Sequence, residues 1–502
     1  MNIVTSTRPS GLRIRSADVP GRCYSTLTFG VGARDESVFN RTITEVVQEL
    51  VMQQLAPIAL PGTNGSDELS AWFSASGTVE QVAQHFRAVS EAIGRLAHDL
   101  TSATLDRARR RLRGDDTPSF IWPFAGTSTF RYGVEGVGLG DFSTSASEWL
   151  TPTDVMQWTA RYFTASNAVI SSSQASPVDF DLDLPDGDGP PVRARSAMPV
   201  VTEPTLLLSP NGGMNLTLLL PAASAELVGI ALAAELRARL VPNRARDVVP
   251  YFTRIDDEVA LLDLHVPLFH DREARESEAI LDGFGQLVDS GVSAASVEFS
   301  REEALRDLED TPSAVVSLMS VTDELQLLGF ADPTREEYRA GAEALTPDVV
   351  DTAVRAALPS LIVLVDGSAL GSPKALAGLT SVARERGLEV DTFDMLRASR
   401  ASWDKASKDA RVWAARKSGS EAGTEAVITA KRALFRAADG LAEIRFRDIV
   451  LVAVESSGTT TLVDYRGRHL QIEASDWKHG QQFVRALRKA VPAGLVREFP
   501  AV

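Results

Sequence analysis

Cysteine and histidine are scarce in this chain of 502 residues, and their scarcity excludes several kinds of site. The single cysteine, Cys23, has no partner for an internal disulfide and cannot by itself build a cysteine-based zinc site. Only six histidines occur, and no two of them stand four positions apart, the spacing that lets two helical side chains share a metal ion. The chain therefore lacks a cysteine-based zinc site and a helical pair of histidines for zinc.

Long apolar runs and an excess of positive charge are missing as well. No segment approaches about 18 uninterrupted apolar residues, and the N-terminus has no apolar core of the length that a signal peptide needs. We therefore expect a cytoplasmic protein that has no membrane partner. The formal net charge of −16 argues against nucleic acid as the main partner. Basic charge is carried mainly by Arg, beside many Ala, Val and Leu, which suggests a bacterial genome of high GC content.

A strand-like run and a helix stand together near the N-terminus. They read LTFGVGARDES at 27–37 and RTITEVVQELVMQQL at 41–55. The pair resembles the start of the insulinase/pitrilysin family of inverted zinc peptidases, whose first strand and helix carry Gly-x-Arg-x-Glu followed by His-x-x-Glu-His. Gly32, Arg34 and Glu36 stand where the family has its approach run.

The helix lacks the groups with which that family binds zinc. Glu45 and Glu49 replace the two zinc-binding histidines, and Gln48 replaces the general-base glutamate. Two glutamates favour harder cations, and an amide cannot take a proton from water. The third ligand of the family is a later glutamate, but the matching run at 105–115 is basic here. We therefore expect a degenerate zinc motif and no metal or cofactor in this chain; the alternative is that Glu45 and Glu49 bind a different metal.

The chain repeats one design of about 190 residues. Leu-Thr-Pro, an amphipathic helix and an apolar strand recur at 150–173 and 345–367, with Thr as N-cap and Pro in the first turn. This predicts an α+β fold with similar halves at 1–182 and 203–370, joined by a linker rich in Pro, Gly and Asp at 183–202. The family resemblance covers both halves and implies that they form half of a chamber.

The family pattern ends near residue 370. Residues 371–425 predict a helical connector that becomes loose and polar. Residues 426–502 alternate like antiparallel strands and close with an amphipathic helix, for which Ser475 is the expected N-cap. This order resembles a small pleckstrin-homology-like (PH-like) domain, and we expect it to be separable from the halves. Its first hairpin lacks the basic cluster of a phosphoinositide site, so a protein or peptide ligand is expected.

A glycine-containing run, FRYGVEGVGLGDF, lies at 130–142 in the first half. Its glycine spacing and the lack of a buried strand leading into it argue against a nucleotide-binding loop. We expect a structural loop there, as the family resemblance also implies.

Arg244 and Tyr251 follow the first helix of the second half and stand seven positions apart. The resemblance implies that an Arg and a Tyr at this place contact the substrate and help to bind the carbonyl that becomes an oxyanion. A tyrosine hydroxyl can donate a hydrogen bond to that oxygen, and an arginine can hold a carbonyl or carboxylate. Arg237 and Arg246 compete with Arg244 for this role. The alternative interpretation is a solvated arginine and a tyrosine at a strand edge.

Together these features predict the noncatalytic, zinc-free subunit of a heterodimeric insulinase-family metallopeptidase. The resemblance implies a catalytic partner subunit that carries His-x-x-Glu-His and zinc, to which this chain supplies Arg244 and Tyr251 in trans. The expected substrate is a short unfolded peptide, for example the leader segment of a ribosomally made peptide. The alternative function is a pseudoenzyme that binds peptides or scaffolds an assembly.

Overall fold

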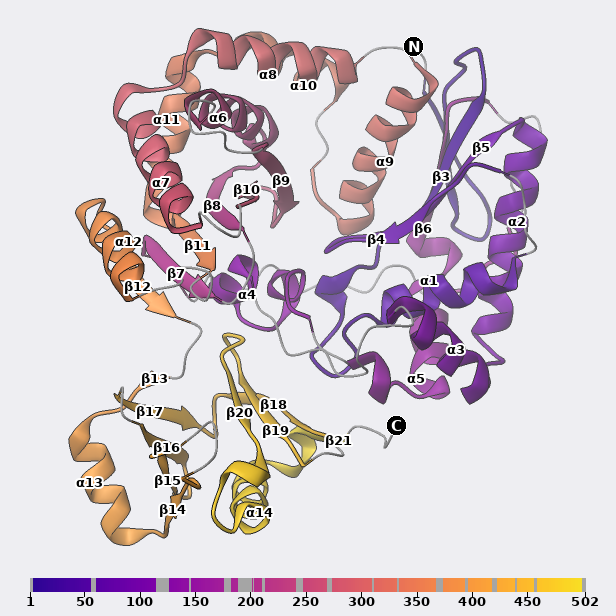
Figure 1. The fold of residues 1–502 in the computed structure, drawn as a ribbon. Helices are drawn as coiled ribbons and strands as arrows, with labels where there is room; N and C mark the ends of the chain where they lie inside the picture. The colour runs from indigo at the N-terminus through magenta and orange to yellow at the C-terminus, as the bar shows by residue number, and fades with distance from the viewer. Residues whose placement is uncertain are drawn as a thin grey trace. The chain divides into compact units, whose positions relative to one another are not determined.

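The structure is a computed structural model that divides into two compact units (Figure 1). Unit 1 comprises Met1–Asp35, Thr42–Asp115 and Thr151–Asp391, and unit 2 comprises Glu36–Arg41, Asp116–Leu150 and Thr392–Val502. Within these units the structure describes residues 3–55, 60–113, 126–143, 146–175, 182–187, 201, 203–209, 213–240, 247–268, 273–308, 311–331, 334–366, 373–392, 396–417, 422–437, 440–455 and 458–498.

Unit 1 contains two six-stranded sheets, which we call the first and second sheet. The first sheet has the order β1 (Val4–Thr7), β2 (Arg13–Ser16), β6 (Ala168–Ser172), β3 (Cys23–Phe29), β5 (Ala71–Gly77) and β4 (Asn64–Ser66). The second sheet has the order β12 (Glu389–Thr392), β7 (Thr205–Ser209), β11 (Ile362–Asp366), β8 (Met214–Pro221), β10 (Val259–Val266) and β9 (Val249–Arg254).

Five strands of each sheet follow the same plan. In both sheets a parallel pair, β2 with β6 and β7 with β11, is followed by antiparallel pairings. The antiparallel pairs β3–β5 and β5–β4 correspond to β8–β10 and β10–β9. Strand β9 is therefore the counterpart of β4, and both lie at a sheet edge.

The helices of unit 1 are α1 (Ile43–Gln54), α2 (Val79–Leu96), α3 (Ser102–Arg113), α5 (Pro152–Tyr162), α6 (Ala225–Leu240), α7 (Glu273–Ser290), α8 (Ala294–Asp307), α9 (Pro312–Leu328), α10 (Arg335–Ala344), α11 (Pro347–Ala357) and α12 (Pro373–Glu385). The repeated Thr-Pro signal caps α5 and α11 as the sequence predicts. Thr151 Oγ1 accepts the Asp154 N–H at 3.2 Å, and Thr346 Oγ1 accepts the Val349 N–H at 3.3 Å. These hydrogen bonds satisfy backbone donors that the first helical turn leaves without partners.

Helix α9 belongs to the second half of the chain but packs against β3 and β6 of the first sheet (Figure 1). Thr311 caps it by accepting the Ala314 N–H, Pro312 stands at its first turn, and Gly329 ends it with φ of 75°. A left-handed residue at this position favours glycine, which has no Cβ to clash. The capping signals thus define a helix whose packing partner could not be read from the local sequence.

Unit 2 contains two smaller sheets. One has the order β13 (Leu396–Arg397), β17 (Gly440–Arg445), β16 (Arg432–Ala437), β15 (Glu425–Ile428) and β14 (Val412–Ala414). The other has the order β20 (His469–Ile472), β19 (Thr460–Asp464), β18 (Ile449–Val454) and β21 (Val496–Glu498). Helices α13 (Arg400–Asp409) and α14 (Gly480–Ala490) accompany them, and α4 (Thr127–Tyr132) comes from the earlier part of the chain.

Several details of this C-terminal region differ from the sequence expectation. Residues 371–425 include α12 and α13, but they also supply β12 to the second sheet and β14 to unit 2. Strand β21 follows α14 and pairs parallel with β18. Strands of three or four residues are too short to show a reliable alternation of polar and apolar residues. The PH-like assignment stays a prediction.

Ser475 is not the N-cap of the last helix, contrary to prediction. Residues Ala474–Asp476 form a 3-10 turn, and α14 begins at Gly480 after His479, whose φ is 57°. The Trp477 side chain is buried, and its ring lies 4.4 Å from that of Phe483. The need to bury this indole bends the chain between Ser475 and the helix.

The glycine-containing run at 130–142 packs within unit 2. The Val134 N–H donates to the Tyr465 carbonyl at 2.8 Å, and Gly133 has φ of 84° beside it. A Cβ at Gly133 would lie 2.8 Å from the same carbonyl, so a larger residue would clash. The run has a structural role, as predicted. Because unit 2 includes residues 36–41 and 116–150, it differs from the separable C-terminal domain that the sequence suggests.

Candidate functional site

Gln48, for which the sequence resemblance predicts the position of a general base, faces the backbone of the first sheet. The side chain is only 2% exposed. Its Nε2 donates to the Gly65 carbonyl and, at 3.2 Å, to the Trp72 carbonyl. Gln48 therefore fastens helix α1 to strands β4 and β5. An amide that donates both hydrogen bonds to backbone carbonyls cannot also activate a water molecule.

Glu49, for which the sequence resemblance predicts the position of a zinc-binding histidine, pairs with an amide and a guanidinium group. Its Oε1 accepts from Gln53 Nε2 at 2.9 Å and from Arg111 Nη1 at 3.2 Å. Arg111 lies on α3, in the basic run where the sequence resemblance predicts a third ligand. The Glu49 carboxylate is therefore paired with a guanidinium in this structure.

These groups do not fit zinc. Glu45 lies in the first turn of α1 and is half-buried, so the helix offers two carboxylates but no imidazole. Carboxylate oxygens suit Mg²⁺, Ca²⁺ or Mn²⁺ better than zinc, and the Arg111 cation opposes any metal at Glu49. Within the described residues, no group of three or more His, Cys, Asp or Glu side chains could hold a metal ion.

Tyr251 lies on the edge strand β9 of the second sheet. In the pairing of β9 with β10, Tyr251 stands opposite Asp263. Tyr251 is 57% exposed to solvent. Its expected partner Arg244 and the competitor Arg246 lie outside the described residues. The other competitor, Arg237, forms an ion pair with Asp247 and donates from Nη2 to the Val248 carbonyl at 3.3 Å. Arg237 therefore ties the end of α6 to the segment that leads into β9.

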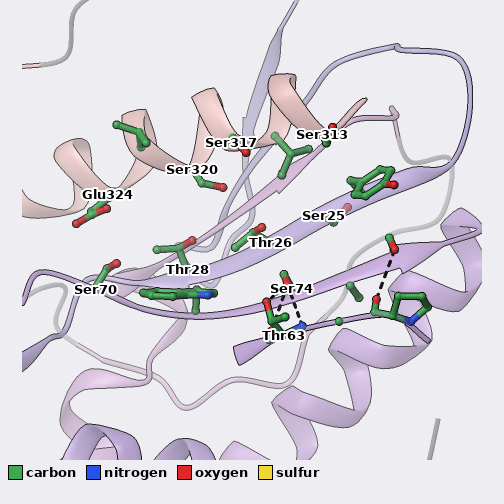
Figure 2. A pocket seen from close by; sticks show the side chains of 18 of the residues that line it. Ser25, Thr26, Thr28, Thr63, Ser70, Ser74, Ser313, Ser317, Ser320 and Glu324 are labelled. Carbon is green, nitrogen blue, oxygen red and sulfur yellow. Dashed lines mark hydrogen bonds between the residues drawn. The ribbon is translucent and has the colours of Figure 1, made fainter. Parts of the chain in front are cut away.

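A groove with a cavity volume of about 550 Å³ lies between the first sheet and helix α9 (Figure 2). Strand alternation puts Tyr24, Thr26 and Thr28 of β3 on one face, opposite Ser76, Ser74 and Trp72 of β5. Helix α9 contributes Ser313, Ser317, Ser320 and Glu324, and the segment before β4 contributes Pro61, Gly62 and Thr63. The walls are therefore rich in hydroxyl groups.

A buried ion pair holds α9 in the position that leaves this groove open. Asp323 is 0% exposed; it accepts from Arg15 Nη1 at 2.7 Å and from the Ser171 hydroxyl. Burial raises the pKa of Asp323, and the Arg15 guanidinium opposes that rise. The apolar residues Val315, Val316 and Met319 pack beside it against Ala17 and Val19. The helix is thus fixed over β3 and β6, and its serines line the groove together with residues of β3 and β5.

The groove has acidic groups in its wall and no basic side chain among its described lining residues. Its carboxylates are those of Asp67 and Glu324. Asp67 Oδ1 accepts the N–H groups of Leu69 and Ser70, both at 2.8 Å, and so shapes the turn between β4 and β5.

The sequence analysis did not identify the residues that line the groove, because hydroxyls that alternate along a strand are also typical of an ordinary solvated face.

No helix in the described part of the chain is long and apolar enough to cross a membrane.

Comparison with known proteins gives fold neighbours only. No protein-family model and no curated protein matches the chain. A peptidase M16 inactive domain from Pseudomonas fluorescens superposes with a TM-score of 0.57 at 14% identity, over 72% of this chain and 98% of that chain. A protease from Helicobacter pylori gives 0.56 at 12% identity, over 72% and 98%. A chain of Complex III2 from Candida albicans gives 0.55 at 13% identity, over 72% and 95%.

Identities of this size show the fold and nothing finer. They support the insulinase-like fold expected from the sequence, since the neighbours include a peptidase M16 domain described as inactive. The chain therefore has the fold of peptidase M16 domains.

Proposed function

We propose that this chain is the zinc-free subunit of a two-component insulinase-type peptidase. In this proposal its two halves form half of a chamber, and a partner subunit with His-x-x-Glu-His closes the other half. The observation that carries the proposal is the contrast between two edges of unit 1. Beside β4, the Gln48 side chain is committed to backbone carbonyls, whereas on β9 the Tyr251 side chain is exposed to solvent.

The exposed tyrosine is suited to act on a peptide that another subunit cleaves. Zinc in the partner would polarise the scissile carbonyl. The Tyr251 hydroxyl would donate a hydrogen bond to the oxygen of that carbonyl as negative charge develops on it. Strand β9 is paired with β10 along its inner side, which fixes the direction of the tyrosine before the substrate arrives. Arg244 would hold a carbonyl or carboxylate of the same peptide.

The alternative function is a pseudoenzyme that binds peptides or scaffolds an assembly. Two observations favour it: Gln48 and Glu49 are engaged in structural hydrogen bonds, and the fold also occurs in a chain of Complex III2. Under this alternative Tyr251 has no part in the chemistry. Short unfolded peptides are the ligands expected under both functions, and a leader segment is one candidate.

Mixing the chain with its partner tests the proposal. The partner is sought as a His-x-x-Glu-His protein of the same fold that co-purifies with this chain. We expect each subunit alone to hydrolyse a quenched fluorescent peptide at the background rate and the mixture to exceed it by at least about 100-fold, because one subunit lacks zinc and the other lacks half of the chamber. A partner that is as active alone as in the mixture would refute the shared site and favour the scaffold.

A further inference from the structure

We propose that the groove between the first sheet and α9 binds an extended peptide segment, and that Glu324 selects a basic side chain in that segment. The inference deepens the proposed function and rests on its peptide-binding part, which both candidate functions share. It assigns a role to residues that neither the degenerate helix nor the Tyr251 edge uses.

The shape of the groove follows from the way α9 is held. Ser313, Ser317, Ser320 and Glu324 are spaced by four, three and four positions, so they share one helical face (Figure 2). The buried Asp323 fixes the rotation of the helix about its axis, because it must reach Arg15 and Ser171. Small side chains on the face toward β3 and β5 then leave an open volume of about 550 Å³. This volume lies in the range of about 300–1,000 Å³ that is typical of ligand sites.

The chemistry of the walls matches a peptide backbone. A peptide unit presents one N–H donor and one carbonyl acceptor, and a serine or threonine hydroxyl can serve either group. Thr26 of β3 and Ser317 of α9 bring such hydroxyls from two different elements. The rings of Trp72 and Tyr24 add partly exposed apolar surface that can pack against side chains of the bound segment.

One hydroxyl of the wall lacks a hydrogen-bond partner. Ser320 Oγ is buried and makes no hydrogen bond within the described residues. A buried hydroxyl without a partner costs roughly 1–3 kcal/mol, so such groups usually serve a purpose. Rotation of the Ser320 side chain about its Cα–Cβ bond would bring this hydroxyl to the groove, where a peptide amide would supply the missing hydrogen bond.

The charge of the groove selects the kind of peptide. Asp67 and Glu324 are its charged lining residues in the described part of the chain, and the protein as a whole carries a net charge of −16. An anionic ligand would be repelled, whereas a guanidinium or ammonium group would be attracted. Glu324 follows the anchored Asp323 directly, so its backbone is held in place. An arginine presents five N–H donors and can therefore bind a carboxylate that also has another partner.

Fluorescence anisotropy with the full-length chain alone tests the inference. The probes are three labelled peptides of about ten residues on one Gly/Ala/Ser background, with two Arg, two Gln or two Glu at the same positions. We expect the Arg peptide to bind at least about 10-fold more tightly than the Glu peptide, with the Gln peptide between them. Added salt should weaken the binding of the Arg peptide most.

Two variants and a matched control locate the binding. Glu324→Gln should weaken the Arg peptide to the level of the Gln peptide and leave the Gln peptide unchanged. Ser317→Tyr should weaken all three peptides, because its ring fills the groove from an exposed helix position. Glu302→Gln makes the same charge change at an exposed position of α8 and should change nothing. Thermal unfolding of each variant confirms that it is folded.

Several outcomes would overturn the inference: no measurable binding of any peptide, a preference for the Glu peptide, or unchanged binding by both groove variants. These outcomes are separate from failure of the proposed function, because the assay contains no partner and no catalysis. A Tyr465→Phe variant, which removes a partly exposed hydroxyl in unit 2, should bind the three peptides as the wild type does. If the reconstituted pair is active while no peptide binds to the groove, this inference alone fails.

Discussion

Replacing Tyr251 by Phe should lower the turnover of the reconstituted pair by about 10²–10³-fold. The substitution removes one hydroxyl from an exposed position on β9 and leaves the ring in place, so packing and assembly should be unaffected. Loss of a single hydrogen-bond donor to a developing oxyanion typically has an effect of this size. The expected signature is a lower kcat with little change in KM, because the hydrogen bond strengthens only in the transition state.

The assay needs a control for loss of a hydroxyl as such. Tyr465→Phe removes a hydroxyl from another partly exposed tyrosine, in unit 2, and should leave the rate unchanged. Size-exclusion chromatography of each mixture shows that the subunits still assemble. A Tyr251→Phe pair that assembles and works at the wild-type rate would remove the tyrosine from the chemistry and leave the scaffold function.

Arg244→Ala, by contrast, should raise KM as well as lower kcat, as expected for a group that positions the peptide.

Replacing Asp323 by Ala should lower the free energy of unfolding by about 3–5 kcal/mol. The carboxylate is the buried partner of Arg15, whose side chain is itself only 13% exposed. Its removal leaves a positive charge in a low-dielectric environment, together with the Ser171 hydroxyl that it also binds. Urea denaturation followed by circular dichroism measures the change.

A double substitution separates the charge effect from packing. Asp323→Leu combined with Arg15→Met removes both charges at similar volume and should recover most of the stability lost in Asp323→Ala. Glu302→Ala on α8 is the control for removal of an exposed carboxylate and should change stability by less than about 0.5 kcal/mol. Equal losses in Asp323→Ala and in the double variant would contradict the assignment of Asp323 as a charge-paired anchor.

The parts of the fold that the sequence predicted are those specified by local signals. Thr151 and Thr346 cap helices at equivalent places because a hydroxyl and a following proline act within one turn. The sequence also predicted that Glu45, Gln48 and Glu49 share one face of a helix, because residues three and four positions apart lie on the same side of it. Neither inference needed knowledge of distant contacts.

The parts that the sequence did not predict depend on segments far apart in the chain. The groove needs residues near 25, 74 and 317, and no local pattern says that α9 packs on the first sheet. Residues 130–142 belong to unit 2, where the Val134 N–H donates a hydrogen bond to the Tyr465 carbonyl more than 300 positions later in the sequence. The partner of Glu49 was likewise hidden, because Arg111 stands 62 positions later in the sequence. Long-range pairings of this kind leave little trace in a single sequence.

The zinc content of the purified chain tests the central claim most directly. The account holds that helix α1 binds no zinc, because it offers no imidazole, Gln48 binds backbone carbonyls and Glu49 binds Arg111. After equilibrium dialysis against micromolar zinc, elemental analysis should find well below about 0.1 zinc per chain, and Glu45→Ala should not change that value. One tightly bound zinc per chain, lost in Glu45→Ala, would contradict the account and restore a metal to this helix.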